Sequence, residues 1–208
     1  FKKFLQPLLK SVGEFRENSD DDVLIEQVVG PTAADVHMDT RGLIDKVLKL
    51  QGQGQHQSVV EQLHSQMSLF ESDPNFAVLL HLLGISLYRL DRFADAKRVY
   101  ERALQLQPNF PSALNSLGFL LQDVGYINEA RLVFQRALEL APGMAMARLN
   151  LGMAQLKLGD FENGWENYEA RWTGSAESVQ GTFSKPACPL PLWNGDIVTT
   201  DKSLLIIT

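Results

Sequence analysis

The sequence has almost no cysteine, and Cys188 is the single one among 208 residues. One cysteine cannot form a disulfide within its own chain, so a reducing cytoplasm is the expected location. Long apolar runs are also missing, and the longest are far too short to cross a bilayer, so no membrane insertion is predicted. No secretory signal pattern is visible, and the chain opens on Phe1 rather than on methionine, which suggests a trimmed or partial chain.

Positive charge is scarce as well. The chain carries 19 Lys and Arg residues against 25 Asp and Glu residues, which gives a formal net charge of −6. No segment of the chain is strongly basic. Binding to nucleic acid needs a positive surface, so we predict no nucleic-acid partner.

Motifs for catalysis and cofactor binding are absent too. The glycines form neither a G-x-G-x-x-G pattern nor a P-loop, and Cys188 has no acid–base partner nearby in the sequence. The histidines complete no metal spacing and are expected as solvated surface residues: His37, His56, His64 and His81. We therefore predict no catalytic, cofactor-binding or metal-binding residue, and no enzymatic activity for this chain itself.

The chain does contain a repeat with a period of 34 residues. Segments 77–110, 111–144 and 145–172 align without gaps. Each unit is predicted to form two amphipathic helices with small residues at their contact and a proline that ends the second helix. One such pair cannot bury its apolar face alone, so the pairs must stack. The matching positions are Gly84, Gly118 and Gly152; Ala96, Ala130 and Gly164; Tyr100, Phe134 and Tyr168; Ala103 and Ala137; and Pro108 and Pro142.

This pattern resembles the tetratricopeptide repeat. The resemblance implies an all-α fold, a right-handed α-solenoid of helix–turn–helix pairs, with a short C-terminal extended segment. Residues 41–76 look like a divergent copy, because "DPNF" at 73–76 matches "QPNF" at 107–110. The turn of this copy comes early, so its second helix is expected to be nearly a turn longer. The predicted organisation is a helical cap and acidic linker at 1–40, a solenoid at 41–173 with repeats 41–76, 77–110, 111–144 and 145–173, and a tail at 174–208.

An apolar stripe occurs near the start of the chain, at Leu8, Leu9, Val12 and Phe15. Two interpretations are open. The stripe docks a partner or a membrane surface, or it caps the open end of the solenoid, as terminal elements must. Few basic residues and an acidic stretch after the stripe favour the cap.

The resemblance also implies a binding surface. In such solenoids the first helix of each pair lines a concave groove. Five positions of each unit point toward this groove. An apolar and aromatic strip with polar edges suits a protein partner that presents an extended peptide or a helix. The alternative occupants are the chain's own ends, among them the N-terminal helix, and a second copy. The candidate partner-binding residues are Val78, His81, Ile85, Tyr88, Arg89, Asn115, Phe119, Gln122, Asp123, Leu149, Asn150, Met153 and Lys157.

Two known groove types of this family do not match the sequence. Chaperone-tail binders use a clamp of Lys and Asn for a terminal carboxylate, but Arg89 and Lys157 are the only basic residues at the corresponding positions. The repeats of O-linked N-acetylglucosamine transferases carry a ladder of asparagines. Only Asn150 keeps that ladder here, because Leu82 and Ser116 replace it in the other units.

The end of the chain resembles another protein class. "GDFENGWENYEARW" at 159–172 and "PLPLWNGDIVTTDKSLLIIT" at 189–208 resemble the junction in bacterial glycosyltransferases that contain these repeats. In those proteins the repeats lead into a GT-B catalytic domain related to heptosyltransferases and O-linked N-acetylglucosamine transferases. The residues that carry the resemblance are Gly164, Trp165, Tyr168, Glu169, Arg171, Trp172, Pro191, Trp193 and Gly195.

Residues 203–208 are then predicted to form the first strand of a catalytic domain that lies beyond the chain. The resemblance implies that this chain is an arm that recruits protein substrates for a glycosyltransferase. A free-standing scaffold is the alternative. An unpaired strand edge needs a neighbour, so homodimerisation is a further expectation.

Overall fold

The computed structural model describes residues 40–172, and every secondary-structure element in this range is a helix. The all-α solenoid predicted from the repeat is confirmed. The elements are α2 (Thr40–Gly52), α3 (His56–Gln66), the short 3-10 helix η1 (Met67–Leu69), α4 (Phe76–Arg89), α5 (Phe93–Leu106), α6 (Pro111–Asp123), α7 (Ile127–Leu140), α8 (Ala145–Lys157), α9 (Phe161–Tyr168) and the 3-10 helix η2 (Glu169–Trp172).

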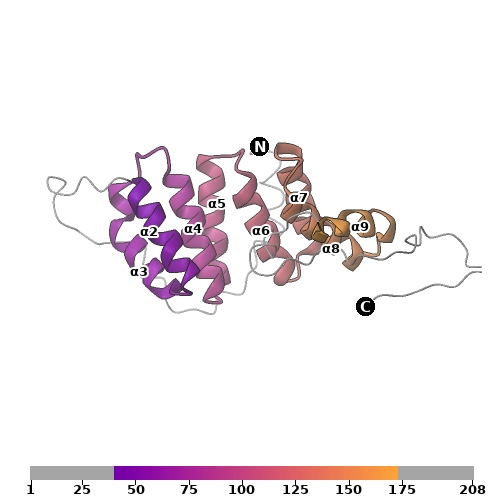
Figure 1. Ribbon diagram of the computed structural model, residues 1–208, viewed down its shortest axis with the longest axis horizontal. Coiled ribbons are helices and arrows are strands. Elements are labelled where there is room, and N and C mark those ends of the chain that lie inside the picture. The colour runs from indigo at the N-terminus through magenta and orange to yellow at the C-terminus, as the bar shows by residue number, and fades with distance from the viewer. Residues whose placement is uncertain (1–39, 173–208) are drawn as a thin grey trace, which may run out of the picture.

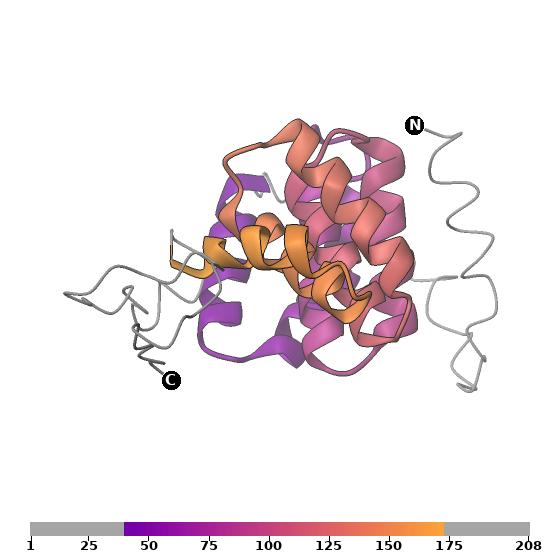
Figure 2. The same cartoon turned by 90° about the vertical axis from the view of Figure 1, so that its right-hand side faces the viewer.

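The helices form antiparallel pairs that stack along one axis (Figure 1). The pairs are α2 with α3, α4 with α5, α6 with α7, and α8 with α9. The second helix of each pair packs against the first helix of the next pair, and the first helices α2, α4, α6 and α8 also contact one another in turn. Figure 2 shows the α9 end of this stack turned toward the viewer. The first helices therefore form a continuous row, which is where the candidate site lies.

The same turn joins the two helices of every pair. A backbone N–H bonds to the carbonyl five residues earlier in each turn, as in Arg92 to Leu87 (3.0 Å) and Tyr126 to Leu121 (2.8 Å). This bond belongs to the Schellman motif, which places one residue in the left-handed region. Glycine holds that position in three of the turns, and Asp91 holds it in the α4–α5 turn with φ 58°.

The left-handed position in the α6–α7 turn should matter for stability. Gly125 has φ 93°, and a Cβ added there would meet no atom within 4 Å. Gly125→Ala is therefore expected to lower the free energy of unfolding by about 1 kcal/mol through backbone strain alone. Asp91→Gly should raise it slightly, because it removes the same strain. Urea denaturation measures both, and equal stabilities for Gly125→Ala and the parent chain would contradict the explanation.

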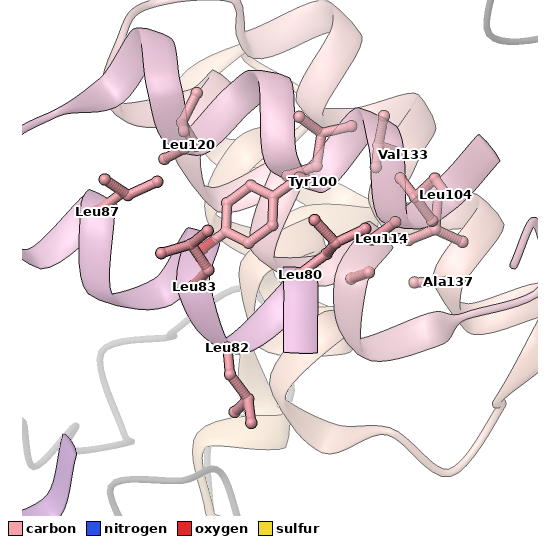
Figure 3. Packing of buried hydrophobic residues seen from close by; sticks show 14 of the residues in the cluster. Leu80, Leu82, Leu83, Leu87, Tyr100, Leu104, Leu114, Leu120, Val133 and Ala137 are labelled. Carbon is pink, nitrogen blue, oxygen red and sulfur yellow. The ribbon is translucent and has the colours of Figure 1, made fainter. Parts of the chain in front are cut away.

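Small residues lie at the helix contacts, as predicted, but their neighbours differ. A Cβ on Gly84 would lie 2.4 Å from Tyr100 Cε1, and one on Gly118 would lie 2.6 Å from Phe134 Cε1. At these two glycines an aromatic ring, rather than a backbone, fills the space. Figure 3 shows the Tyr100 ring among leucine side chains of α4 and α6. At Gly152 the neighbour is the backbone itself, with the Tyr168 nitrogen 2.6 Å from the added Cβ.

The first pair differs from the prediction of a longer second helix. α3 has 11 residues, whereas α5 and α7 each have 14. The extra residues instead form the connection to α4, which contains η1. Asp73 precedes a proline, which disfavours helical backbone there, and its carboxylate accepts hydrogen bonds from the Thr40 hydroxyl and the Asn75 N–H. The expected longer helix is therefore wrong.

Several predictions concern residues outside the described range. They are the cap and acidic linker before Thr40, the tail at 174–208 with its strand at 203–208, and the surface position of His37. Between residues 40 and 172, no helix has the length and apolarity needed to cross a bilayer.

Candidate functional site

The candidate residues all lie on the first helices of three successive pairs. Those numbered 78–89 are on α4, those numbered 115–123 are on α6, and those numbered 149–157 are on α8. Each of these helices begins directly after a proline-containing connection, and α6 has Pro111 at its first turn, where a proline costs no hydrogen bond. The repeat thus brings equivalent positions of α4, α6 and α8 side by side.

Side-chain hydrogen bonds connect neighbouring first helices with a spacing of 35 residues, one more than the sequence period. His81 Nε2 lies 3.0 Å from Ser116 Oγ. Asn150 Nδ2 donates to Asn115 Oδ1 at 3.0 Å. The Tyr88 hydroxyl donates to Asp123. Polar candidates are therefore partly used to hold the stack together.

His81 is buried and is not the solvated residue that was expected. Its side chain is 8% exposed, and its ring lies edge-on to Phe110 at 5.1 Å and near Tyr100 at 6.0 Å. Burial lowers the pKa of His81 to about 4, so the imidazole is neutral at pH 7. The expectation was wrong because His81 follows the apolar pattern of α4, where it occupies an inward position. His64 is exposed and His56 is half-buried, on α3.

Other candidates are also buried: Gln122, Leu149 and Asn150. The Gln122 Oε1 atom has no hydrogen-bond partner among the described residues. These side chains, like His81, are packed inside the stack and offer little surface to a partner. The remaining candidates are exposed or half-buried and together form the first-helix face. They are Val78, Ile85, Tyr88, Arg89, Asn115, Phe119, Asp123, Met153 and Lys157.

An apolar strip runs along the first-helix face. Ile85, Phe119 and Met153 occupy the same position in successive repeats and are all half-buried, and Ile85 and Phe119 also pack against the core. The Tyr88 ring lies edge-on to Phe119, with 5.6 Å between ring centroids. Burial and the bond to Asp123 raise the pKa of Tyr88, so its hydroxyl keeps its proton. The aromatic part of the strip is thereby held in a fixed orientation.

Charged side chains border this strip at the C-terminal ends of the helices. Arg89, Asp123 and Lys157 occupy equivalent positions on α4, α6 and α8, and all three are exposed. Asp123 is bound by Tyr88. Within residues 40–172, neither Arg89 nor Lys157 forms an ion pair. The strip therefore has two free cations at its edge, two repeats apart.

Ser116 and Gln51 are part of this row but were not predicted as site residues. Gln51, on α2, donates from Nε2 to the Leu82 carbonyl at 2.8 Å and to Ser86 Oγ at 2.9 Å. Both residues are polar residues on first helices. Ser116 occupies the same repeat position as Asn150, which was predicted as a site residue. This equivalence is the sequence signal that could have identified Ser116.

A hollow of about 450 Å³ lies between the α3–α4 connection and the end of α5, lined in part by Asp73, Phe76 and Leu106. None of the residues that line it is a candidate residue. The residues from Thr40 to Trp172 hold no group of three His, Cys, Asp or Glu side chains that could bind a metal ion.

Comparison with known proteins supports the repeat assignment. The family described as tetratricopeptide repeat matches residues 77–110, and a second family of the same description matches residues 120–170. No curated protein matches the chain.

The solved structure of MamA shows a similar fold. It matches with a TM-score of 0.56 and 17% identity, over 69% of this chain and 82% of that chain. The first tetratricopeptide repeat domain of Spaghetti (RPAP3), solved with the HSP90 peptide SRMEEVD, matches with a TM-score of 0.49 and 23% identity, over 60% of this chain and 98% of that one.

Proposed function

Because the chain contains tetratricopeptide repeats, we propose that it is a protein-interaction module whose first-helix face binds a peptide segment of a partner protein. The observation that carries the proposal is the apolar strip of Ile85, Phe119 and Met153. These side chains are half-buried and keep part of their apolar surface exposed along a row where most neighbouring positions are buried. A surface of this kind recovers free energy when a partner covers it.

The form of the strip favours an extended peptide or a helix laid across the row. Aromatic and long apolar side chains give anchoring contacts, and Arg89 and Lys157 add positive charge at one edge. A partner with apolar side chains in the middle and an acidic group toward that edge fits best. Electrostatic attraction at an exposed edge would act mainly on the rate of association.

A displayed peptide library tests the proposal. Peptides selected on the whole chain are expected to lose about tenfold or more in affinity when Phe119→Ala is introduced, a change of about 1.4 kcal/mol. The measurement is isothermal titration with a selected peptide. Tyr88→Phe should have a smaller effect, because it keeps the ring against Phe119 and removes only the bond to Asp123.

The matched control for this test is Leu106→Ala. Leu106 is an exposed apolar residue on the second helix α5, lines the hollow and is not part of the first-helix face. Its replacement should leave peptide affinity unchanged. The reverse result, with loss of affinity in Leu106→Ala and none in Phe119→Ala, would assign binding to the hollow and reject the proposal.

A second proposal concerns the protein that the module serves. The "GWENYEARW" and "PLPLWNG" motifs support a role as the substrate-recruiting arm of a glycosyltransferase, with catalysis outside residues 1–208. The coding sequence beyond the codon for Thr208 tests this role. A strand, a glycine-rich loop and a helix are expected there, and a stop codon would leave the free-standing scaffold as the remaining interpretation.

A further inference from the structure

We propose that the outer face of α9 is a docking site for the proline-rich segment of this same chain at 189–193, "PLPLW". The outer face is defined by three apolar side chains, Leu158 in the α8–α9 turn and Phe161 and Trp165 on α9, which are 39%, 61% and 57% exposed. Phe161 and Trp165 lie four residues apart, about one turn along α9, at the end of the stack. Figure 1 shows α9 at that end, and only the short 3-10 helix η2 follows it among the described residues.

The equivalent positions in the preceding repeat are less exposed. Val124 and Ile127 correspond to Leu158 and Phe161, and both are half-buried against the core. There α8 follows and packs on α7. The last repeat keeps apolar residues at these positions although, within residues 40–172, no further α-helix follows and only the short 3-10 helix η2 comes after α9. A terminal repeat exposed to water would instead carry a polar outer face.

Trp165 strengthens this difference. The equivalent residues in the preceding repeats are Lys97 and Arg131, which are cations. The last repeat therefore replaces a charged side chain by the largest apolar one, at a position that is 57% exposed. This is the opposite of what solvation alone favours, and it indicates that something covers Trp165.

The Trp165 ring is held in place by its neighbours. It lies edge-on to Tyr168, with 5.8 Å between ring centroids. The Arg171 guanidinium lies 4.5 Å from the ring centres of both Tyr168 and Trp172. This series of stacked groups runs from the outer face to Trp172. The chain therefore continues from the immediate neighbourhood of the face.

The segment at 189–193 has the chemistry to cover the face. Its prolines alternate with leucines and it ends on a tryptophan. Proline-rich segments adopt an extended helix with little entropy to lose, and exposed aromatic rings are their usual binding surface. Only 16 residues, 173–188, separate Trp172 from Pro189. At about 3.3–3.6 Å per residue this connection can reach any point on a helix as short as α9.

The connection also favours this occupant over others. A tethered segment binds at an effective concentration on the order of millimolar, so weak contacts suffice. Charge agrees with the choice: α9 exposes Glu162 and Glu166, while the single charged side chain between 181 and 195 is Lys185. We therefore assign the face to the chain's own segment rather than to a second copy or a foreign protein.

The single cysteine makes a direct test possible. A nitroxide attached to Cys188, next to the segment, should reduce the amide NMR signals of α9 in the whole chain. The signals of α2 and α3, at the other end of the stack, should keep their intensity. Trp165→Arg copies the residue of the preceding repeat and should restore the α9 signals, and Trp193→Ala in the segment should do the same. Unchanged α9 signals in the labelled parent chain would reject the proposal.

Mixed samples distinguish docking within one chain from docking between two copies of the chain. Spin-labelled chain without isotope is combined with isotope-labelled chain without spin label. Loss of the α9 signals in the mixture as strongly as in the singly labelled chain would assign the face to a second copy and overturn the proposal. Leu48→Arg, an exposed change on α2, controls for the added charge and should leave the pattern as in the parent chain. Melting of each variant by circular dichroism verifies that the stack is folded.

Discussion

Replacing Phe134 by alanine is expected to lower the free energy of unfolding by about 3–5 kcal/mol. The ring is fully buried and lies against Gly118, at the contact between α7 and α6. Its removal loses apolar burial and leaves a cavity between two helices whose backbones are fixed by the neighbouring pairs. Urea denaturation followed by circular dichroism gives the value, and a loss below about 1 kcal/mol would show that the site collapses freely.

The contact with Gly118 gives this prediction a second part. Gly118→Leu alone should cost about 1–3 kcal/mol, because its Cβ would lie 2.6 Å from the ring. With Phe134→Ala present, the leucine enters the space that the ring has left. The double variant should therefore lose less than the sum of the two changes, by about 1 kcal/mol or more. When Phe134→Ala is combined with Leu63→Ala on the distant helix α3, the two losses in the free energy of unfolding should add.

Stability is expected to fall as the pH drops from about 6.5 toward 4 because of His81. Its pKa is lowered from 6.5 to about 4 by burial, so the folded protein holds the neutral imidazole. The unfolded chain takes up a proton first, and the stability present above pH 6.5 is lost as the pH falls through this window. At 1.36 kcal/mol for each pKa unit, the loss approaches about 3 kcal/mol near pH 4.

Carboxylates also titrate in acid, so the prediction rests on a comparison of variants. His81→Gln keeps a polar side chain opposite Ser116 but cannot titrate, and its stability should depend less on pH between 6.5 and 4. His64→Gln removes an exposed histidine and should leave the dependence as it is in the parent chain. Equal pH dependence of unfolding in His81→Gln and the parent would contradict the assignment.

The repeat spacing was enough to predict the stack and several of its contacts. Gly118 and Phe134 recur at fixed offsets in each unit, and their contact follows from that regularity. Position-based reasoning also placed Ile85, Phe119 and Met153 in equivalent, partly exposed sites. Such features depend on a pattern that each unit repeats, so the sequence contains them several times over.

Features that occur once were not predictable in this way. His81 was expected in water because histidine usually is, whereas its burial depends on Phe110, at the end of its own repeat, and on Ser116, which comes from the next repeat. The length of α3 was misjudged because the extra residues were counted as helix. The backbone before Pro74 turns instead, and Asp73 fixes the turn by hydrogen bonds.

The stacking of helices only on near neighbours has a kinetic consequence. All extensive contacts join elements that are adjacent or next but one along the chain. Ordering any helix pair therefore closes only short loops, so the stack should fold fast, in the range of microseconds to milliseconds that is typical of chains with local contacts. Under tension applied at its two ends, the stack should unfold one helix pair at a time, beginning with the least stable pair.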